Sequence, residues 1–147
     1  MNAEAIALEA ALRIKAHQLR DAELAKTAGG RERAQNTLNG FCHWTFPGYL
    51  DSPHLDMLDS ALEDVEAGRC DRLMVFMPPR HGKSEKISVR FPAWYLCRNP
   101  HKKIISESYD DDLATEWGRQ VRNIVHTQSL YPTVRLAADS KAKALWH

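Results

Sequence analysis

The chain has 147 residues, 44% of them hydrophobic, which is enough for one ordinary domain with an apolar core. Its 20 basic and 19 acidic residues leave a formal net charge of +1, which excludes the strongly basic character of a free-standing nucleic-acid binder. The widely spaced Cys42, Cys70 and Cys97 argue against a disulfide framework or a zinc site, and no apolar run is long enough to span a membrane, so we expect a soluble, unexported protein.

Residues 3–27 predict an amphipathic helix, because Leu8, Leu12 and Leu19 recur with alanines at helical spacing along one face. The pair Gly29 and Gly30 ends this pattern, and residues 31–39 predict a second short helix. We interpret residues 1–40 as a helical amino-terminal arm, and we expect the apolar face of its first helix to be packed.

An aromatic, turn-rich connector follows at residues 41–53, and a third helix begins after it. Ser52 is a suitable N-cap, Pro53 occupies the first helical position, and Gly68 supplies the stop. The buried stripe of this helix is predicted to contain Leu55, Leu58, Leu62 and Val65.

The region after Gly68 predicts an alternation of strands and helices. Residues 73–77 form a continuous apolar run, which is typical of a strand buried on both faces, and residues 103–109 predict a second strand. A buried helix is expected from Gly82 to about Leu96, with a kink at Pro92, and another from 110 to 126. This order predicts an α/β fold in which a parallel sheet with right-handed crossovers carries flanking helices.

The junction of the first strand and its helix, residues 77–84, reads M-P-P-R-H-G-K-S. It matches the phosphate-binding pattern G-x-x-x-x-G-K-[ST] over its last three positions, but Met77 replaces the first glycine. Pro78 and Pro79 lack an N–H group, so the donors for a phosphate are confined to residues 80–84, where Gly82 allows positive φ. A plain strand-to-helix turn has no need for this combination of residues.

The side chains of this loop match the needs of nucleotide phosphates. Lys83 can reach the β- and γ-phosphate oxygens, and the Ser84 hydroxyl can ligate Mg²⁺. Arg80 is a permanent cation suited to stabilising charge on a transferring phosphoryl group.

The run M-P-P-R-H-G-K-S-E, followed by F-P-A-W-Y-L and N-P-H-K-K-I-I-S-E-S-Y, resembles the ATPase domain of tailed-phage terminase large subunits over about residues 41–125. The resemblance implies a P-loop NTPase fold of the RecA-like (ASCE) class for residues 41–147. It implies an ATP-driven motor that packages double-stranded DNA in the bacterial cytoplasm, as a homo-oligomeric ring with a portal protein and a terminase small subunit as partners.

The resemblance also assigns roles to individual residues. Arg80 and Lys83 are implied as catalytic groups, and Ser84 as the ligand of Mg²⁺. Contacts to ATP are implied for the loop residues Arg80, His81, Gly82, Lys83, Ser84 and Glu85. Residues 46–54, ahead of the loop, are implied to line the adenine side.

Hydrolysis requires a second acidic motif, an apolar strand ending in Asp and Glu, and the sequence contains no convincing copy. The nearest candidates, Asp110, Asp111 and Asp112, are explained by the positive end of the following helix. We therefore expect an incomplete ATPase domain, truncated before that motif and the nuclease, which is inactive alone and marginally stable because its sheet edge is unpaired. Another P-loop ATPase, helicase-like or kinase fragment, or a non-catalytic remnant, remains the alternative.

Overall fold

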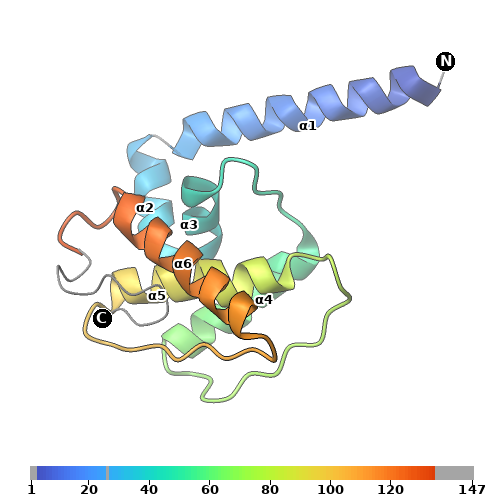
Figure 1. Cartoon of the computed structure of the whole chain (residues 1–147). Coiled ribbons are helices and arrows are strands. Elements are labelled where there is room, and N and C mark those ends of the chain that lie inside the picture. The colour runs from blue at the N-terminus through green and yellow to red at the C-terminus, as the bar shows by residue number, and fades with distance from the viewer. Residues whose placement is uncertain (1–2, 26, 135–147) are drawn as a thin grey trace. The chain divides into compact units, whose positions relative to one another are not determined.

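A computed structural model of the chain describes residues 3–25 and 27–134 (Figure 1). Its contacts group the chain into two units, Met1–Ser52 and Pro53–His147, and each is described here by itself. The division into domains after residue 40 stays a prediction. Lys26, in the first predicted helix, and residues 135–147, in the predicted ATPase domain, lie outside the described residues.

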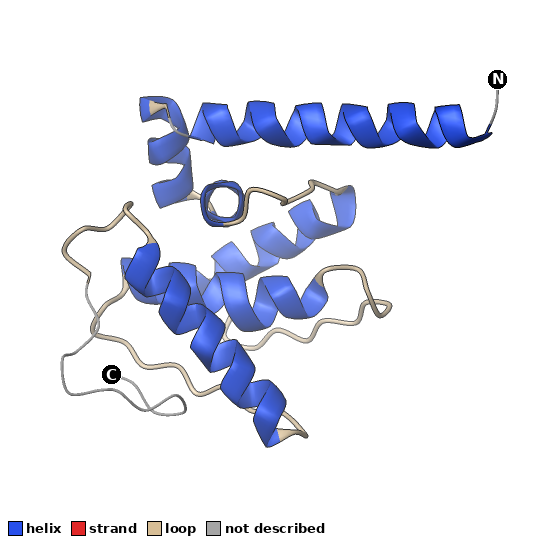
Figure 2. Cartoon of the chain, turned by 45° about the horizontal axis from the view of Figure 1, so that its top comes forward, coloured by secondary structure: helices blue, strands red, loops and turns tan. Residues whose placement is uncertain are grey.

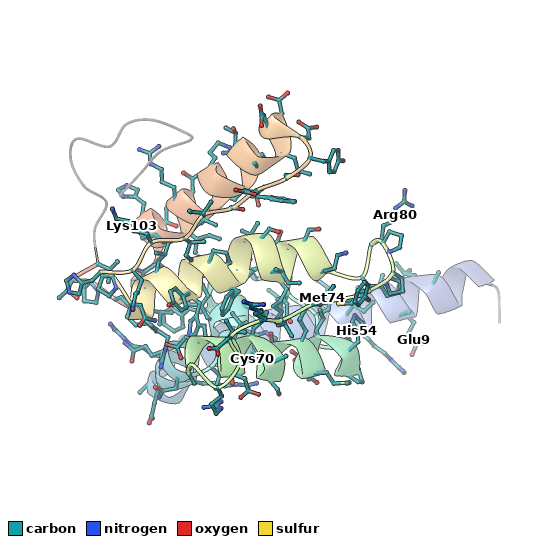
Figure 3. All side chains as sticks on the ribbon, turned by 90° about the horizontal axis from the view of Figure 1, so that it is seen from below. Glu9, His54, Cys70, Met74, Arg80 and Lys103 are labelled. Carbon is teal, nitrogen blue, oxygen red and sulfur yellow. The ribbon has the colours of Figure 1, made fainter. Side chains whose placement is uncertain are left out.

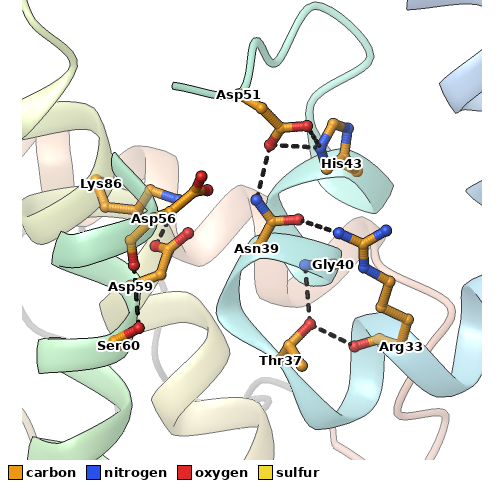
Figure 4. Close-up of polar contacts among 10 residues, drawn as sticks. All are labelled: Arg33, Thr37, Asn39, Gly40, His43, Asp51, Asp56, Asp59, Ser60 and Lys86. Carbon is orange, nitrogen blue, oxygen red and sulfur yellow. Dashed lines mark hydrogen bonds and ion pairs between the residues drawn. The ribbon is translucent and has the colours of Figure 1, made fainter. Parts of the chain in front are cut away.

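The first unit contains helices α1 (Ala3–Ala25), α2 (Ala28–Asn36) and α3 (Leu38–Thr45). Its core is the corner between α2 and α3, where Ala34, Leu38, Phe41 and Cys42 are fully buried. Thr37 makes this corner, because its hydroxyl donates to the Arg33 carbonyl at 2.9 Å and accepts from the Gly40 N–H at 3.1 Å (Figure 4). Only glycine fits at position 40, since a Cβ there would lie 2.6 Å from the Arg33 carbonyl oxygen.

Helix α1 confirms the prediction of an amino-terminal helix, but the expectation that its apolar face is packed is wrong. Leu8, Leu12 and Leu19 are 63%, 58% and 62% exposed. The helical spacing of the leucines is local information, whereas burial needs a partner surface. Within the described part of the chain, each of these leucines stays more than half exposed.

The second unit contains α4 (Pro53–Glu66), η1 (Glu85–Arg90), α5 (Phe91–Arg98) and α6 (Asp111–Thr127). Helix α5 packs against α6, and η1 contacts both. The predicted stripe of α4 is confirmed for its three leucines. The buried apolar side chains of this unit are Leu55, Leu58, Leu62, Val89, Ala93, Trp94, Cys97, Val121, Val125 and Leu130.

Just before Pro92, where a kink was predicted, the helix contains a π-helical segment. Proline has no N–H group and its ring crowds the carbonyl of the preceding turn, which disfavours a regular α-helix there. The six residues of η1 widen the turn just before Pro92, so that the Phe91 N–H bonds to the Lys86 carbonyl. The helix continues beyond this segment as α5.

The predicted α/β fold is wrong. Residues 3–25 and 27–134 contain helices and loops but no strand, so the parallel sheet of a RecA-like (ASCE) P-loop NTPase is absent from the described chain (Figure 2). Residues 73–77 and 103–109 are instead unpaired segments. Met74 and Phe76 are 79% and 84% exposed, and Ile105 is 86% exposed.

The physical reason is that a strand is not a local structure. Its N–H and C=O groups must be bonded by neighbouring segments, and an apolar run carries no information about which segments those are. In the described chain the segment from Cys70 past Met74 to Arg80 is a long loop without a strand partner (Figure 3). Only Cys70, Val75 and Met77 are half-buried there, and no backbone hydrogen bond within the described residues involves 73–77.

Candidate phosphate-binding loop

Residues 78–84 form a tight loop between the extended segment and the helix that contains η1 and α5. Arg80 and Gly82 both have positive φ, 65° and 80°. The Lys86 N–H donates to the Gly82 carbonyl at 3.0 Å, so the helix begins directly after the second of these residues. The unbonded N–H groups of its first turn therefore lie at the end of the loop, where an anion is favoured.

The left-handed conformation was predicted for Gly82 but not for Arg80. Arg80 is the one residue other than glycine with positive φ among the described residues. This conformation costs a side-chain-bearing residue about 1–2 kcal/mol, and such strain gathers at functional sites. A sequence has no signal for it, because arginine is not a residue that favours the region.

Arg80, Lys83 and Ser84 are the predicted site residues whose side chains are available. Arg80 and Ser84 are exposed and Lys83 is half-buried. Within the described part of the chain, none of the three side chains makes a hydrogen bond or ion pair. In Figure 3, Arg80 projects away from α4 and α5.

His81 and Glu85, also predicted as nucleotide contacts, are engaged within the protein. The His81 Nδ1 atom lies 2.9 Å from the Pro79 carbonyl oxygen, which can only accept, so Nδ1 carries the proton. Glu85 pairs with the nearly buried guanidinium of Arg90 at 2.6 Å. Both side chains therefore shape the loop and the turn that follows it.

Helix α4 supports the loop through its first turn. The His54 Nε2 atom lies 3.3 Å from the His81 carbonyl oxygen, and the two imidazole rings meet edge to face at 5.7 Å. The Leu55 methyl groups lie against Gly82, where an added Cβ would be 3.4 Å from Leu55 Cδ2. His54, the last residue of the segment 46–54 that was predicted to line the adenine side, thus contacts the loop.

One turn further along, α4 makes a buried ion pair that was not predicted. The Lys86 Nζ atom lies 2.6 Å from Asp59 Oδ1, and the two side chains are 1% and 6% exposed (Figure 4). Burial raises the pKa of the Asp59 carboxyl, and the ammonium group of Lys86 opposes that shift. Asp59 Oδ2 has no hydrogen-bond partner in the described structure.

A signal for this pair was present in the sequence. Asp59 lies four residues after Leu55, within the apolar stripe of α4, and Lys86 precedes Val89 and Ala93 on the buried side of the next helix. Two opposite charges on two predicted buried faces indicate a pair, because a lone buried charge is costly.

The acidic residues after 109 cap a helix. The Asp110 carboxylate accepts the Asp112 N–H at 2.9 Å, and Asp111 and Asp112 lie in the first turn of α6. This arrangement confirms the helix-capping interpretation. The catalytic role has no support in the geometry.

No family model matches the chain, and no curated protein or solved structure is detectably similar to it. Among the described residues, no helix combines the length and apolarity needed to cross a membrane. The same part of the chain has no group of three or more His, Cys, Asp or Glu side chains that could hold a metal ion.

Proposed function

We propose that residues 80–84 bind the phosphates of ATP, together with Mg²⁺. The observation that carries this proposal is the conformation of the loop. Two residues with positive φ, Arg80 and Gly82, stand immediately before the first turn of a helix. Such a turn exposes backbone N–H groups to an anion, and the positive end of the helix dipole adds to the attraction.

Each available side chain has a role in this site. Lys83, in the first helical turn, donates to phosphate oxygens as a point charge. Ser84 offers one hydroxyl oxygen to Mg²⁺, a hard cation that keeps most of its water and takes its other ligands from phosphate. Arg80 adds a permanent positive charge that can neutralise phosphate.

The wider function we propose is that of the ATP-binding portion of a DNA-packaging motor similar to a phage terminase large subunit. It rests on the resemblance of residues 41–125 to that family. Double-stranded DNA, a portal protein, a terminase small subunit and further copies of the chain would then be its partners in the bacterial cytoplasm.

A second candidate is a nucleotide-binding segment without catalysis, and one observation favours it. Glu85, the acidic residue next to the loop, is held by Arg90 at 2.6 Å and is not free to orient an attacking water. We therefore expect ATP binding without phosphate release from this chain. Release of phosphate that is lost in Lys83→Ala would instead support a complete ATPase.

Calorimetric titration of the full chain with ATP, with Mg²⁺ or with EDTA, tests the proposal. Lys83→Ala should weaken binding about tenfold to a hundredfold, because a hydrogen bond to a charged group contributes about 1.5–3 kcal/mol. Lys103→Ala is the matched control. Lys103 is an exposed lysine of the same unit that lies on the far side from Arg80 in Figure 3. Equal affinities for wild type and Lys83→Ala would remove this loop as the site.

A further inference from the structure

The contacts between α4 and the phosphate loop lie on one side of that helix. His54, Leu55 and Asp59 provide them, and they reach the His81 carbonyl, the Gly82 backbone and the Lys86 side chain in turn. The loop and the first turn of its helix are therefore attached to α4 at three successive points. The strongest of them is the ion pair.

Burying this pair between α4 and η1 costs desolvation free energy. Asp59 and Lys86 are 6% and 1% exposed, so both charges have left water. Replacing such a pair with apolar side chains of similar volume is often neutral or stabilising, so stability alone does not explain why charges occupy these positions. What a buried charged pair adds is a penalty for separation, since moving the two groups apart would leave each charge buried without a partner.

The ion pair acts close to the loop. Lys86 uses its backbone N–H to bond the Gly82 carbonyl at 3.0 Å and its side chain to reach Asp59 at 2.6 Å. Its position relative to α4 therefore sets the position of the Gly82 carbonyl and of the first helical turn, which carries Lys83 and Ser84. A shift of this turn would move the donors that face a phosphate.

We propose that Asp59 and Lys86 form a positioning pair that holds the phosphate loop in its binding conformation. The inference rests on the proposed function of the loop. Neither residue touches the phosphate; both act through Gly82, Lys83 and Ser84. Helix α4 thereby becomes the element that sets the affinity of the site.

The test uses the double variant Asp59→Leu with Lys86→Met in the full chain, which removes both charges and keeps similar volumes. Amide hydrogen exchange over residues 80–86 should become about tenfold faster or more, while α6 exchanges as in wild type. Affinity for ATP with Mg²⁺ should fall about tenfold. The melting temperature should stay the same or rise, which a purely structural role would not combine with a weaker site.

The exchanged pair Asp59→Lys with Lys86→Asp is the rescue, because it restores one charge of each sign. It should regain part of the loop protection and of the ATP affinity. If the double variant does not fold, Lys86→Met serves in its place, because the Asp59 carboxyl, whose pKa is raised by burial, can take up a proton when its partner is removed; the loss should again be largest at residues 80–86.

The outcomes separate this inference from the proposed function. Loop exchange and affinity equal to wild type in the double variant would overturn the positioning role, as would faster exchange spread equally over α6. If the wild-type chain does not bind ATP at all, the proposed function fails. In that case the exchange of residues 80–86 alone still decides whether the pair holds the loop.

Discussion

Replacement of Gly82 by alanine is the sharpest test of the loop geometry. Gly82 has φ of +80°, a conformation that costs an alanine about 1–2 kcal/mol. The added Cβ would lie 3.4 Å from Leu55 Cδ2 and 3.6 Å from Leu55 Cδ1, which are ordinary contact distances, so steric overlap adds little. We therefore expect Gly82→Ala to lower the free energy of unfolding by about 1–2 kcal/mol. ATP affinity should fall up to about tenfold, because the loop can relax out of its strained conformation.

Gly68→Ala is the matched control. Gly68 has φ of +71° and nothing within 4 Å of an added Cβ, so the backbone cost should be the same, but it follows α4 far from the loop in sequence. Urea denaturation should give similar losses of stability for the two variants, and calorimetric titration should show weaker ATP binding for Gly82→Ala alone. Unchanged stability and affinity in Gly82→Ala would refute the assigned loop conformation. Equal loss of affinity in both variants would show that binding follows global stability instead.

Three further results are expected. Phe76→Lys should change the free energy of unfolding by less than about 0.5 kcal/mol in urea, because Phe76 is 84% exposed; a loss of several kcal/mol would mean that it is buried. Cys97 should stay unreactive toward a thiol reagent at pH 8 until the protein unfolds, because burial raises the pKa of its thiol to about 12. In the first unit, burial raises the pKa of Asp51, but hydrogen bonds from Asn39 and His43 outweigh it and the net pKa lies below 3.8. This contribution to stability is present above pH 3.8 and is lost as the pH falls through the lower value, so Asp51→Asn should weaken the acid dependence of unfolding.

Most of the helices could be predicted because their signals are local, but α3 (Leu38–Thr45) was not, since residues 41–53 were expected to form a turn-rich connector. Pro53 at the first position of α4, the leucines at helical spacing and the Asp110 cap of α6 each act within one or two turns. A disturbance of the regular helix near Pro92 was also predictable, since it follows from the chemistry of a single residue. The π-helical segment that stands there was not, because the type of turn depends on how the neighbouring turns pack.

The strands could not be predicted in the same way. The run at residues 73–77 is apolar throughout, and burial on both faces was inferred from that fact alone. Whether such a run pairs depends on segments distant in sequence, and the described chain bonds none to it. The same holds for the leucines of α1, because apolar residues at helical spacing predict the helix but not the surface that buries them.

In the candidate site, too, the local features could be predicted and those that depend on distant residues could not. Lys83 and Ser84 stand at the start of a helix, as the motif predicted, because the pattern G-K-[ST] describes a local turn. The left-handed conformation of Arg80 and the ion pair between Asp59 and Lys86 could be found only in the three-dimensional structure. The motif therefore identified the groups that we propose face a ligand, and the structure identified the groups that we propose hold them.

The phosphate loop of this chain is supported differently from a loop that follows a strand of a sheet. In a parallel sheet, the strand before a phosphate loop is fixed by its neighbours, and the loop inherits that rigidity. Here the segment before the loop has no such neighbours among the described residues, and α4 contacts the loop instead. Support by the segment before the loop and support by α4 predict opposite effects of two substitutions on ATP affinity. If the segment mattered most, Phe76→Lys would weaken ATP binding and Asp59→Asn would not. Support by α4 requires the reverse, because Phe76 is exposed and Asp59 is buried against Lys86.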